Sequence, residues 1–118
     1  MDDREIERFL EARGVADHVR TLGRTGLISR WTKFIDQVEQ GYPLGLDDYR
    51  NDLDIREIIR IVGLDKDVAD ADRKFQRLLT ATHTRVWRGN TDNDFWNLGY
   101  PQNASGELLR DLREAKLV

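Results

Sequence analysis

The chain has 118 residues, of which 19 are basic and 22 are acidic, so that its formal net charge at neutral pH is −3. This length suits one domain with its own hydrophobic core, and the small acidic excess argues against a dedicated nucleic-acid binder, because such domains are usually basic. Since the chain has no cysteine, a disulfide framework and a thiolate metal site are both excluded.

The N-terminus and the apolar runs indicate where the protein resides. The first residues, Met1-Asp2-Asp3-Arg4-Glu5, are charged from the second position onward, whereas a secretory signal peptide needs an apolar core. No apolar run approaches the ~18 residues that a helix needs to span a bilayer. We therefore expect a cytoplasmic protein without a membrane partner.

Two amphipathic segments precede the strongest helical pattern of the chain. A first helix is expected over residues 2–13 and ends at Gly14. A second, shorter segment ends at Gly23, and residues 23–26 are typical of a turn. The side chains that define the two apolar faces are Ile6, Phe9, Leu10, Val15, Val19 and Leu22.

The main helix begins near Leu27 and is the element around which we expect the others to pack. Thr25 or Ser29 can cap its start, Gly41 is a natural residue just beyond its end, and Pro43 cannot continue it. Its apolar residues fall within an arc of about 120° on a helical wheel. These residues are Leu27, Ile28, Trp31, Phe34, Ile35 and Val38.

The segment after Pro43 changes its apolar face halfway along. A single straight helix buries both faces only if it is sandwiched, so we expect a break near Asp54, which starts a capping-box pattern with Glu57. The prediction is one short helix over residues 47–52 and another over 55–62, or one sharply kinked helix. The first face holds Leu46, Tyr49 and Leu53, and the second holds Ile55, Ile58, Ile59 and Val62.

A long helix is expected after Gly63, which closes the preceding one. Asp65 or Asp67 caps it, and an apolar stripe from Val68 to Val86 predicts about five turns that end near Trp87. Acidic residues early in the helix and basic residues late in it agree with the helix macrodipole.

Residues 88–104 combine glycine, asparagine, aspartate and proline with several aromatic side chains. A loop of this length in a compact domain is typically a packed cover or a binding segment. Ser105 then caps a last helix, whose apolar face includes Leu108 and Leu112. The prediction is an all-α fold in which residues 1–118 form a single bundle of five to seven short helices, covered by this loop.

Charge is unevenly distributed along the chain. Residues 36–72 carry eleven acidic and four basic residues, whereas residues 73–88 carry five basic residues and no acidic one. We expect these five bases on one side of the long helix, where they can bind an acidic protein or a phosphate group, or pair with the acidic middle of the same chain. The candidate partner-binding residues are Arg73, Lys74, Arg77, Arg85 and Arg88, with Phe95 and Trp96 of the loop.

The acidic residues after Pro43 suggest two further sites. Asp47, Asp48, Asp52 and Asp54 are candidate ligands of a divalent cation, because hard metals prefer several carboxylates, although helix caps and a solvated surface explain them more simply. A hydrogen-bond network of Asn51, Asp52 and Arg56 is expected to be buried and to fix the bend. Because His18 and His83 belong to no nucleophile–base constellation, no catalytic residue and no cofactor is predicted.

Two stretches together resemble a group of small uncharacterised bacterial proteins of similar length. They are Trp31-x2-Phe34-x3-Val38-Glu39-x-Gly41-Tyr42 and Asp48-Tyr49-x-Asn51-Asp52-Leu53-Asp54-x-Arg56. The resemblance implies a small bacterial helical protein, and it transfers no activity, cofactor or site.

Three functions follow from these patterns. The first is a non-catalytic binding protein, such as an adaptor or an immunity- or antitoxin-like partner of another protein. The second is a nucleic-acid or phosphate-ligand binder that uses the basic residues 73–88. The third is a metal-dependent enzyme at the acidic residues 47–54. The oligomeric state is not predicted.

Overall fold

The computed structural model describes residues 2–14, 23–79 and 99–116, and within these ranges the fold is all-α, as expected. One isolated β-bridge joins Leu79 to Pro101. The helices are α1 (Asp3–Ala12), α3 (Gly23–Gln40), α4 (Leu46–Ile61), α5 (Ala69–Leu78) and α6 (Gly106–Glu114), with the 3₁₀ turn η1 (Asp65–Val68) before α5.

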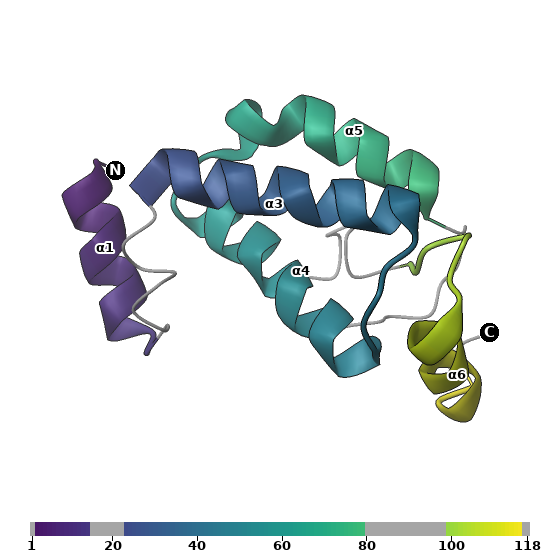
Figure 1. Ribbon diagram of the computed structural model, residues 1–118. Helices are drawn as coiled ribbons and strands as arrows, with labels where there is room; N and C mark the ends of the chain where they lie inside the picture. The colour runs from purple at the N-terminus through teal and green to yellow at the C-terminus, as the bar shows by residue number, and fades with distance from the viewer. Residues whose placement is uncertain (1, 15–22, 80–98, 117–118) are drawn as a thin grey trace.

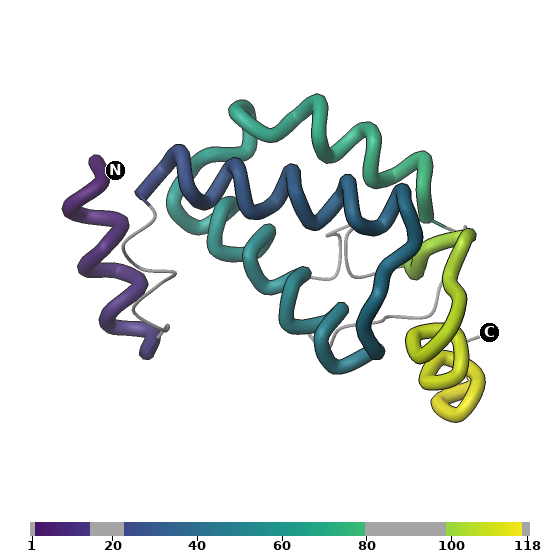
Figure 2. Tube along the Cα trace, in the orientation of Figure 1, coloured from purple at the N-terminus to yellow at the C-terminus, as the bar shows by residue number. Residues whose placement is uncertain are grey.

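Helix α3 is the centre of the arrangement. It lies between α4 and α5 and contacts both, while α1 packs near its N-terminal end (Figure 1). Helix α6 contacts α4 at the opposite end of the molecule from α1. The tube in Figure 2 shows that the short connection after α3 leads directly into α4, so the two helices are consecutive and lie side by side.

The first and last helices agree with the sequence prediction. Asp2 accepts a hydrogen bond from the backbone amide of Glu5 at 2.8 Å and caps α1, whose Ile6 is fully buried. In α6, Leu108 and Leu112 are fully buried. Ser105 occupies the N-cap position but makes no side-chain capping bond, so the predicted cap is wrong. The short segment that contains Val15, Val19 and Leu22 lies outside the described residues.

Helix α3 begins earlier than predicted. Residues 23–26, which were expected to form a turn, belong to its first turn, so that prediction is wrong. The reason is a cap from elsewhere in the chain: Asp3 of α1 accepts a hydrogen bond from the backbone amide of Arg24 at 3.0 Å. The predicted end is confirmed, because α3 stops at Gln40 and Gly41 takes a φ of +114°.

Helix α4 is continuous from Leu46 to Ile61, so the predicted pair of short helices with a break at Asp54 is wrong. The helix buries both apolar faces because it has neighbours on several sides, α3 and α6 among them. Asp54 is not a cap. It lies inside the helix, half-buried, and its carboxylate pairs with Arg13 after α1 at 3.8 Å.

The predicted end of α4, just before Gly63, is confirmed. Gly63 takes a φ of +82°, its amide donates to the carbonyl of Arg60 at 3.1 Å, and the Leu64 amide donates to the carbonyl of Ile59 at 2.9 Å. These two bonds form a Schellman motif, which requires a left-handed residue at the position of Gly63.

Helix α5 is shorter than predicted, because it ends at Leu78 rather than near Trp87. Leu79 is extended, with φ −91° and ψ 149°. The backbone amide of Gln102 donates to the carbonyl of Leu78 at 2.9 Å, and the Gln102 side chain donates to the carbonyl of Leu79 at 2.8 Å. The returning chain therefore takes up the carbonyls at the end of the helix. Asp65 and Asp67 lie in η1 and make no side-chain cap for α5.

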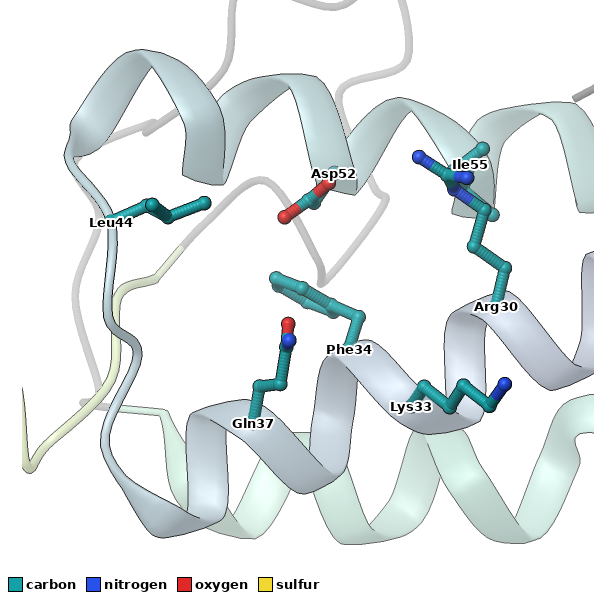
Figure 3. Close-up of a pocket in the computed structure, with 7 residues that line it drawn as sticks. All are labelled: Arg30, Lys33, Phe34, Gln37, Leu44, Asp52 and Ile55. Carbon is teal, nitrogen blue, oxygen red and sulfur yellow. The ribbon is translucent and has the colours of Figure 1, made fainter. Parts of the chain in front are cut away.

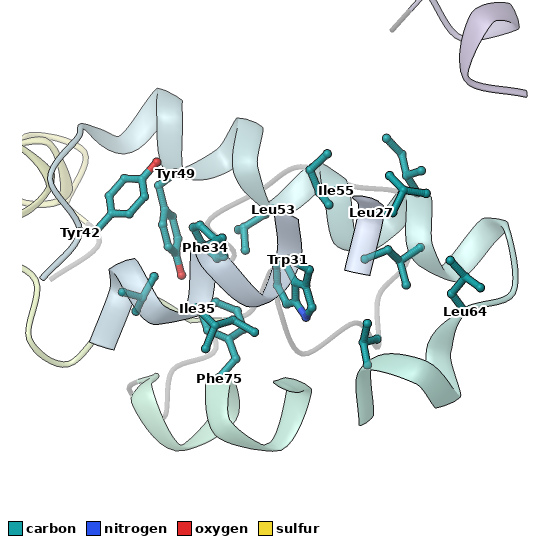
Figure 4. Close-up of a cluster of buried hydrophobic side chains, with 14 of the residues drawn as sticks. Leu27, Trp31, Phe34, Ile35, Tyr42, Tyr49, Leu53, Ile55, Leu64 and Phe75 are labelled. Carbon is teal, nitrogen blue, oxygen red and sulfur yellow. The ribbon is translucent and has the colours of Figure 1, made fainter. Parts of the chain in front are cut away.

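Aromatic side chains form the middle of the core (Figure 4). The ring of Trp31 lies 5.4 Å from that of Phe34 and 5.2 Å from that of Phe75, and the rings of Phe34 and Tyr49 are 5.7 Å apart. Trp31 and Tyr49 are fully buried. Rings of this size each bury about 150–250 Å², so they provide much of the hydrophobic stabilisation. Trp31, Phe34, Tyr42 and Tyr49 thus all lie in the core.

Candidate functional site

The described part of the predicted basic surface is largely used within the chain. Arg73 pairs with Asp70 one turn earlier on α5. Lys74 reaches α3, where its ammonium lies 2.9 Å from Asp36 and 3.2 Å from Glu39. Hydrogen bonds to these two carboxylates raise the pKa of Lys74. This is the intramolecular pairing that the sequence allowed as an alternative to partner binding.

The remaining residues of that surface are placed only in part. Arg77 is exposed in the last turn of α5. Arg85, Arg88, Phe95 and Trp96 lie outside the described residues, so whether they bind a partner stays a prediction.

The candidate metal ligands are dispersed. Asp47 and Asp48 are exposed in the first turn of α4, where their charge suits the helix N-terminus. Asp52 accepts a hydrogen bond of 2.6 Å from the hydroxyl of Tyr42, and Asp54 pairs with Arg13. Burial is the main cause of the raised pKa of Asp54. Within residues 2–14, 23–79 and 99–116, no group of three histidine, cysteine, aspartate or glutamate residues is placed to hold a metal.

A buried polar network surrounds Arg56, whose side chain is only 4% exposed. Its Nε and Nη2 atoms donate to the two carboxylate oxygens of Asp72 at 3.0 and 2.8 Å, and its Nη1 lies 2.7 Å from Asp65. Trp31 Nε1 donates to the same Asp72 at 3.0 Å. Burial lowers the pKa of Arg56, but the bonds to Asp72 and Asp65 outweigh it, so the net shift is upward. The network joins α3, α4, η1 and α5.

The predicted network is therefore right about Arg56 and wrong about its companions. Asn51 is exposed, and Asp52 bonds Tyr42 on the connection between α3 and α4. There is no break in α4 for such a network to fix. The true partner of Arg56, Asp72, lies 16 residues away and is one of many acidic residues in that stretch, so local reasoning had no means to select it.

A groove of about 290 Å³ lies between α3 and α4 (Figure 3). Arg30, Lys33 and Gln37 form its α3 wall, and their spacing of three and four residues places them on one side of the helix. Phe34 and Ile55 lie between the helices and form an apolar floor, with exposed fractions of 4% and 8%. The groove thus combines cationic side chains with an apolar surface.

Two further residues complete the groove. Leu44, on the connection before α4, is 45% exposed and lies at one end. Asp52 belongs to the α4 wall, and the hydroxyl of Tyr42 already donates to it. Burial, together with this bond, raises the pKa of Tyr42, so the hydroxyl stays protonated. The described lining contains no arrangement of nucleophile and base.

Arg30 and Lys33 make no ion pair or side-chain hydrogen bond with the described chain. Both also line a second hollow of about 220 Å³, which extends along α3 to Ser29 and Gly26. The distance from Gly26 to Gln37 along the helix axis is ~16 Å, at 1.5 Å per residue. Two cations that have no ion-pair partner among the described residues therefore lie at the middle of a surface three helical turns long.

The sequence prediction did not select these residues. Arg30 and Lys33 occupy the polar side of an amphipathic helix, which is where any solvated helix carries bases. One residue in the sequence could have pointed to this surface. Leu44 directly follows Pro43 and belongs to none of the predicted apolar helix faces, and in the structure it is exposed at the groove that Arg30 and Lys33 also line.

No helix within the described ranges has both the length and the apolar character of a membrane span. The chain matches no family model, and it has no significant match among the curated proteins or the solved structures.

Proposed function

We propose that this chain is a non-catalytic protein that binds another protein, as an adaptor or an immunity- or antitoxin-like partner does, and that it binds through the groove between α3 and α4. The observation that carries the proposal is the placement of Arg30 and Lys33, without an ion-pair partner in the described chain, over the apolar floor of Phe34 and Ile55. Protein interfaces typically combine such an apolar centre with a charged rim that steers association and selects the partner.

The internal ion pairs favour this groove over the basic surface of α5. Lys74 is held by two carboxylates of α3, and Arg73 by Asp70, so a partner at that surface would have to displace existing pairs. No carboxylate of residues 2–14, 23–79 or 99–116 pairs with Arg30 or Lys33 in this way. For the same reason nucleic acid is the weaker alternative: binding to a phosphate backbone depends on several free cations, and the whole chain is net negative.

A cytoplasmic, bacterial setting belongs to the same proposal. It is supported by a core of this size that contains no cysteine, which suits a reducing compartment, and by the resemblance of the motif around Trp31 to the bacterial group.

Affinity purification with matched variants tests the proposal. Tagged wild-type protein is expected to recover one stoichiometric protein partner from the native cell lysate, and the double variant Arg30→Glu/Lys33→Glu is expected to lose it. Arg4→Glu/Arg8→Glu is the matched control, because these two bases are exposed on α1, away from the groove. Circular dichroism and thermal unfolding establish that all variants fold.

Two outcomes would contradict the proposal. One is a partner recovered equally by wild type and by the α3 double variant. The other is a partner lost with Arg77→Glu and retained with the α3 double variant, which would place the binding surface on α5 as the sequence first suggested.

A further inference from the structure

We infer that the groove receives an acidic amphipathic helix of the partner, with carboxylates along the edge that faces α3 and an apolar stripe that faces the floor. This inference rests on the proposed function and specifies its ligand. It is carried by the charge of the two walls, by the exposed apolar side chain at one end, and by the dimensions of the surface.

The two walls carry opposite charge. The α3 wall presents Arg30 and Lys33, whereas the α4 wall presents Asp52, with exposed Asp48 one turn earlier on the same side of α4. An occupant that is complementary to both walls is acidic on one edge only. A uniformly anionic ligand, such as a nucleic-acid backbone, would bring phosphates against Asp52 and Asp48.

The apolar part of the groove requires an apolar side chain from the occupant. Leu44 and Ile61 are the two large apolar side chains that are exposed in the described chain, and Leu44 is the one that lies at the groove. Because Phe34 and Ile55 are only 4% and 8% exposed, the apolar surface that a leucine or similar residue would cover there is mainly that of Leu44. Burial of apolar surface contributes about 25 cal/mol per Å², so this contact adds affinity that the two cations alone do not supply.

The dimensions suit a helix better than a small molecule. The cavity of about 290 Å³ is at or below the lower limit of small-molecule sites, which span about 300–1,000 Å³. The neighbouring hollow shares Arg30 and Lys33 and extends the surface to Gly26, so that the whole runs for ~16 Å along α3, or three helical turns. Helices that bind in grooves use anchors spaced over two to three turns in this way.

Backbone amide NMR with synthetic peptides of about 15 residues tests the inference, since shorter isolated helices are marginal in water. The first peptide carries a leucine stripe with glutamates along one edge and lysines along the other. The second has lysines on both edges, and the third has alanines in place of the leucines. We expect the first peptide to shift the amide signals of Arg30, Lys33 and Leu44, and the other two to bind at least about tenfold more weakly.

The same peptides are then tested against variants of the protein, including one in which the charges of the α3 wall are reversed. In Arg30→Glu/Lys33→Glu the glutamate-edged peptide is expected to lose about tenfold in affinity, and the peptide with lysines on both edges is expected to bind instead. Leu44→Ala, at an exposed position that the core does not need, is expected to weaken the glutamate-edged peptide without changing its preference for the wild-type charges. Arg4→Glu/Arg8→Glu is expected to bind like wild type.

The outcomes separate this inference from the proposed function. If the peptide with lysines on both edges shifts the amide signals around the groove as much as the glutamate-edged peptide does, the groove does not select an acidic edge. That result overturns the acidic ligand but leaves the groove as a binding surface. Larger shifts with single-stranded DNA or inorganic phosphate overturn the inference in favour of a phosphate ligand. No shift at the groove with the glutamate-edged peptide at millimolar concentration overturns it outright, whereas the proposed function falls only with the purification result above.

Discussion

The carboxylate of Asp111 lies 3.0 Å from the backbone amide nitrogen of Leu46 and caps α4 from 65 residues further along the chain. The residue in the N-cap position of α4 is Gly45, which has no side chain to make this bond. Asp3 serves α3 in the same manner, through the amide of Arg24 at 3.0 Å. The two central helices are therefore capped by carboxylates from the first and last helices, which couples the formation of each terminal helix to a central one.

Replacement of Asp111 by alanine is expected to lower the free energy of unfolding by about 1 kcal/mol, because the Leu46 amide loses its capping carboxylate. Asp111→Asn should retain part of the bond, since an asparagine side chain also accepts from a helix amide. Urea unfolding followed by circular dichroism measures both. Glu114→Ala, at the exposed end of α6, is the control for helix propensity, and an equal midpoint for it and Asp111→Ala would refute the cap.

Gly45 is expected to be coupled to Asp111. A Cβ atom on Gly45 would lie 2.6 Å from the Asp111 carboxylate and 2.9 Å from that of Glu107, so Gly45→Ala must displace the capping group. We expect it to cost about 1 kcal/mol in the wild type and clearly less in the Asp111→Ala background, where one of the two clashes is absent. A double-mutant cycle of urea midpoints measures the coupling, and strictly additive costs would contradict it.

These caps show why the sequence predicted some features and missed others. The ends of α3 and α4 were predictable, because Gly41 and Gly63 act within one turn of the helices that they end. The start of α4 was predicted to within one residue, whereas the start of α3 was missed. The capping carboxylates of both helices were not predictable, because Asp3 and Asp111 come from separate elements. A residue that caps a distant helix looks in the sequence like any other acid on a helix surface.

The same limit applies to the candidate site. The apolar stripe around Trp31 identified the core face of α3 correctly, but only the packing of α4 against it turns Arg30 and Lys33 into one wall of a groove. The expected break at Asp54 failed for a related reason: a change of apolar face indicates a break only when the helix has one neighbour. Continuation of the stripe beyond Leu78 likewise gave no sign that Gln102 returns to donate hydrogen bonds to the carbonyls of Leu78 and Leu79.

Replacement of Arg56 is expected to be the most damaging single polar substitution in the described chain. Arg56→Ala leaves the Asp72 carboxylate beside the core with only Trp31 as a donor, and removal of one member of such a pair costs about 3 kcal/mol or more. Arg56→Lys should recover only part of this, because an ammonium cannot bond both oxygens of Asp72 in the planar geometry of a guanidinium. Urea unfolding measures the series.

The control for Arg56 is Arg73→Lys. Arg73 pairs with Asp70 one turn earlier on α5, and both side chains are exposed, by 62% and 94%. A pair at such a position is worth less than about 1 kcal/mol, so this substitution should have little effect. Similar losses for Arg56→Lys and Arg73→Lys would show that the buried geometry around Arg56 is not what stabilises the fold.

The two buried tyrosines are expected to respond oppositely to loss of the hydroxyl. Tyr42→Phe removes a 2.6 Å hydrogen bond to Asp52 and should lower the free energy of unfolding by about 1.5 kcal/mol. Tyr49 is fully buried, and its hydroxyl has no hydrogen-bond partner in the described chain. Tyr49→Phe should therefore be neutral or stabilise by up to about 1 kcal/mol. Thermal unfolding compares them, and a larger loss for Tyr49→Phe would contradict this assignment.

Asp54 predicts a dependence of stability on pH. Burial raises its pKa above the usual 3.8, and although nearby Arg13 opposes the shift, the net direction is upward. The folded state then binds this proton more tightly than the unfolded state, so the contribution of Asp54 to stability falls as the pH rises from about 3.8 through its pKa in the folded state. Asparagine does not titrate, and Asp54→Asn is accordingly expected to exceed wild type in stability at pH 7.

The advantage of Asp54→Asn at pH 7 should be below about 1 kcal/mol, because the site is partly exposed and the pair with Arg13 is lost. It should shrink as the pH is lowered from 7 to 4, where the wild-type carboxyl takes up its proton. Urea midpoints measured across this range test the prediction, with exposed Glu7→Gln on α1 as the control. An advantage that stays constant over the range, or grows toward pH 4, would mean that burial does not govern this carboxyl.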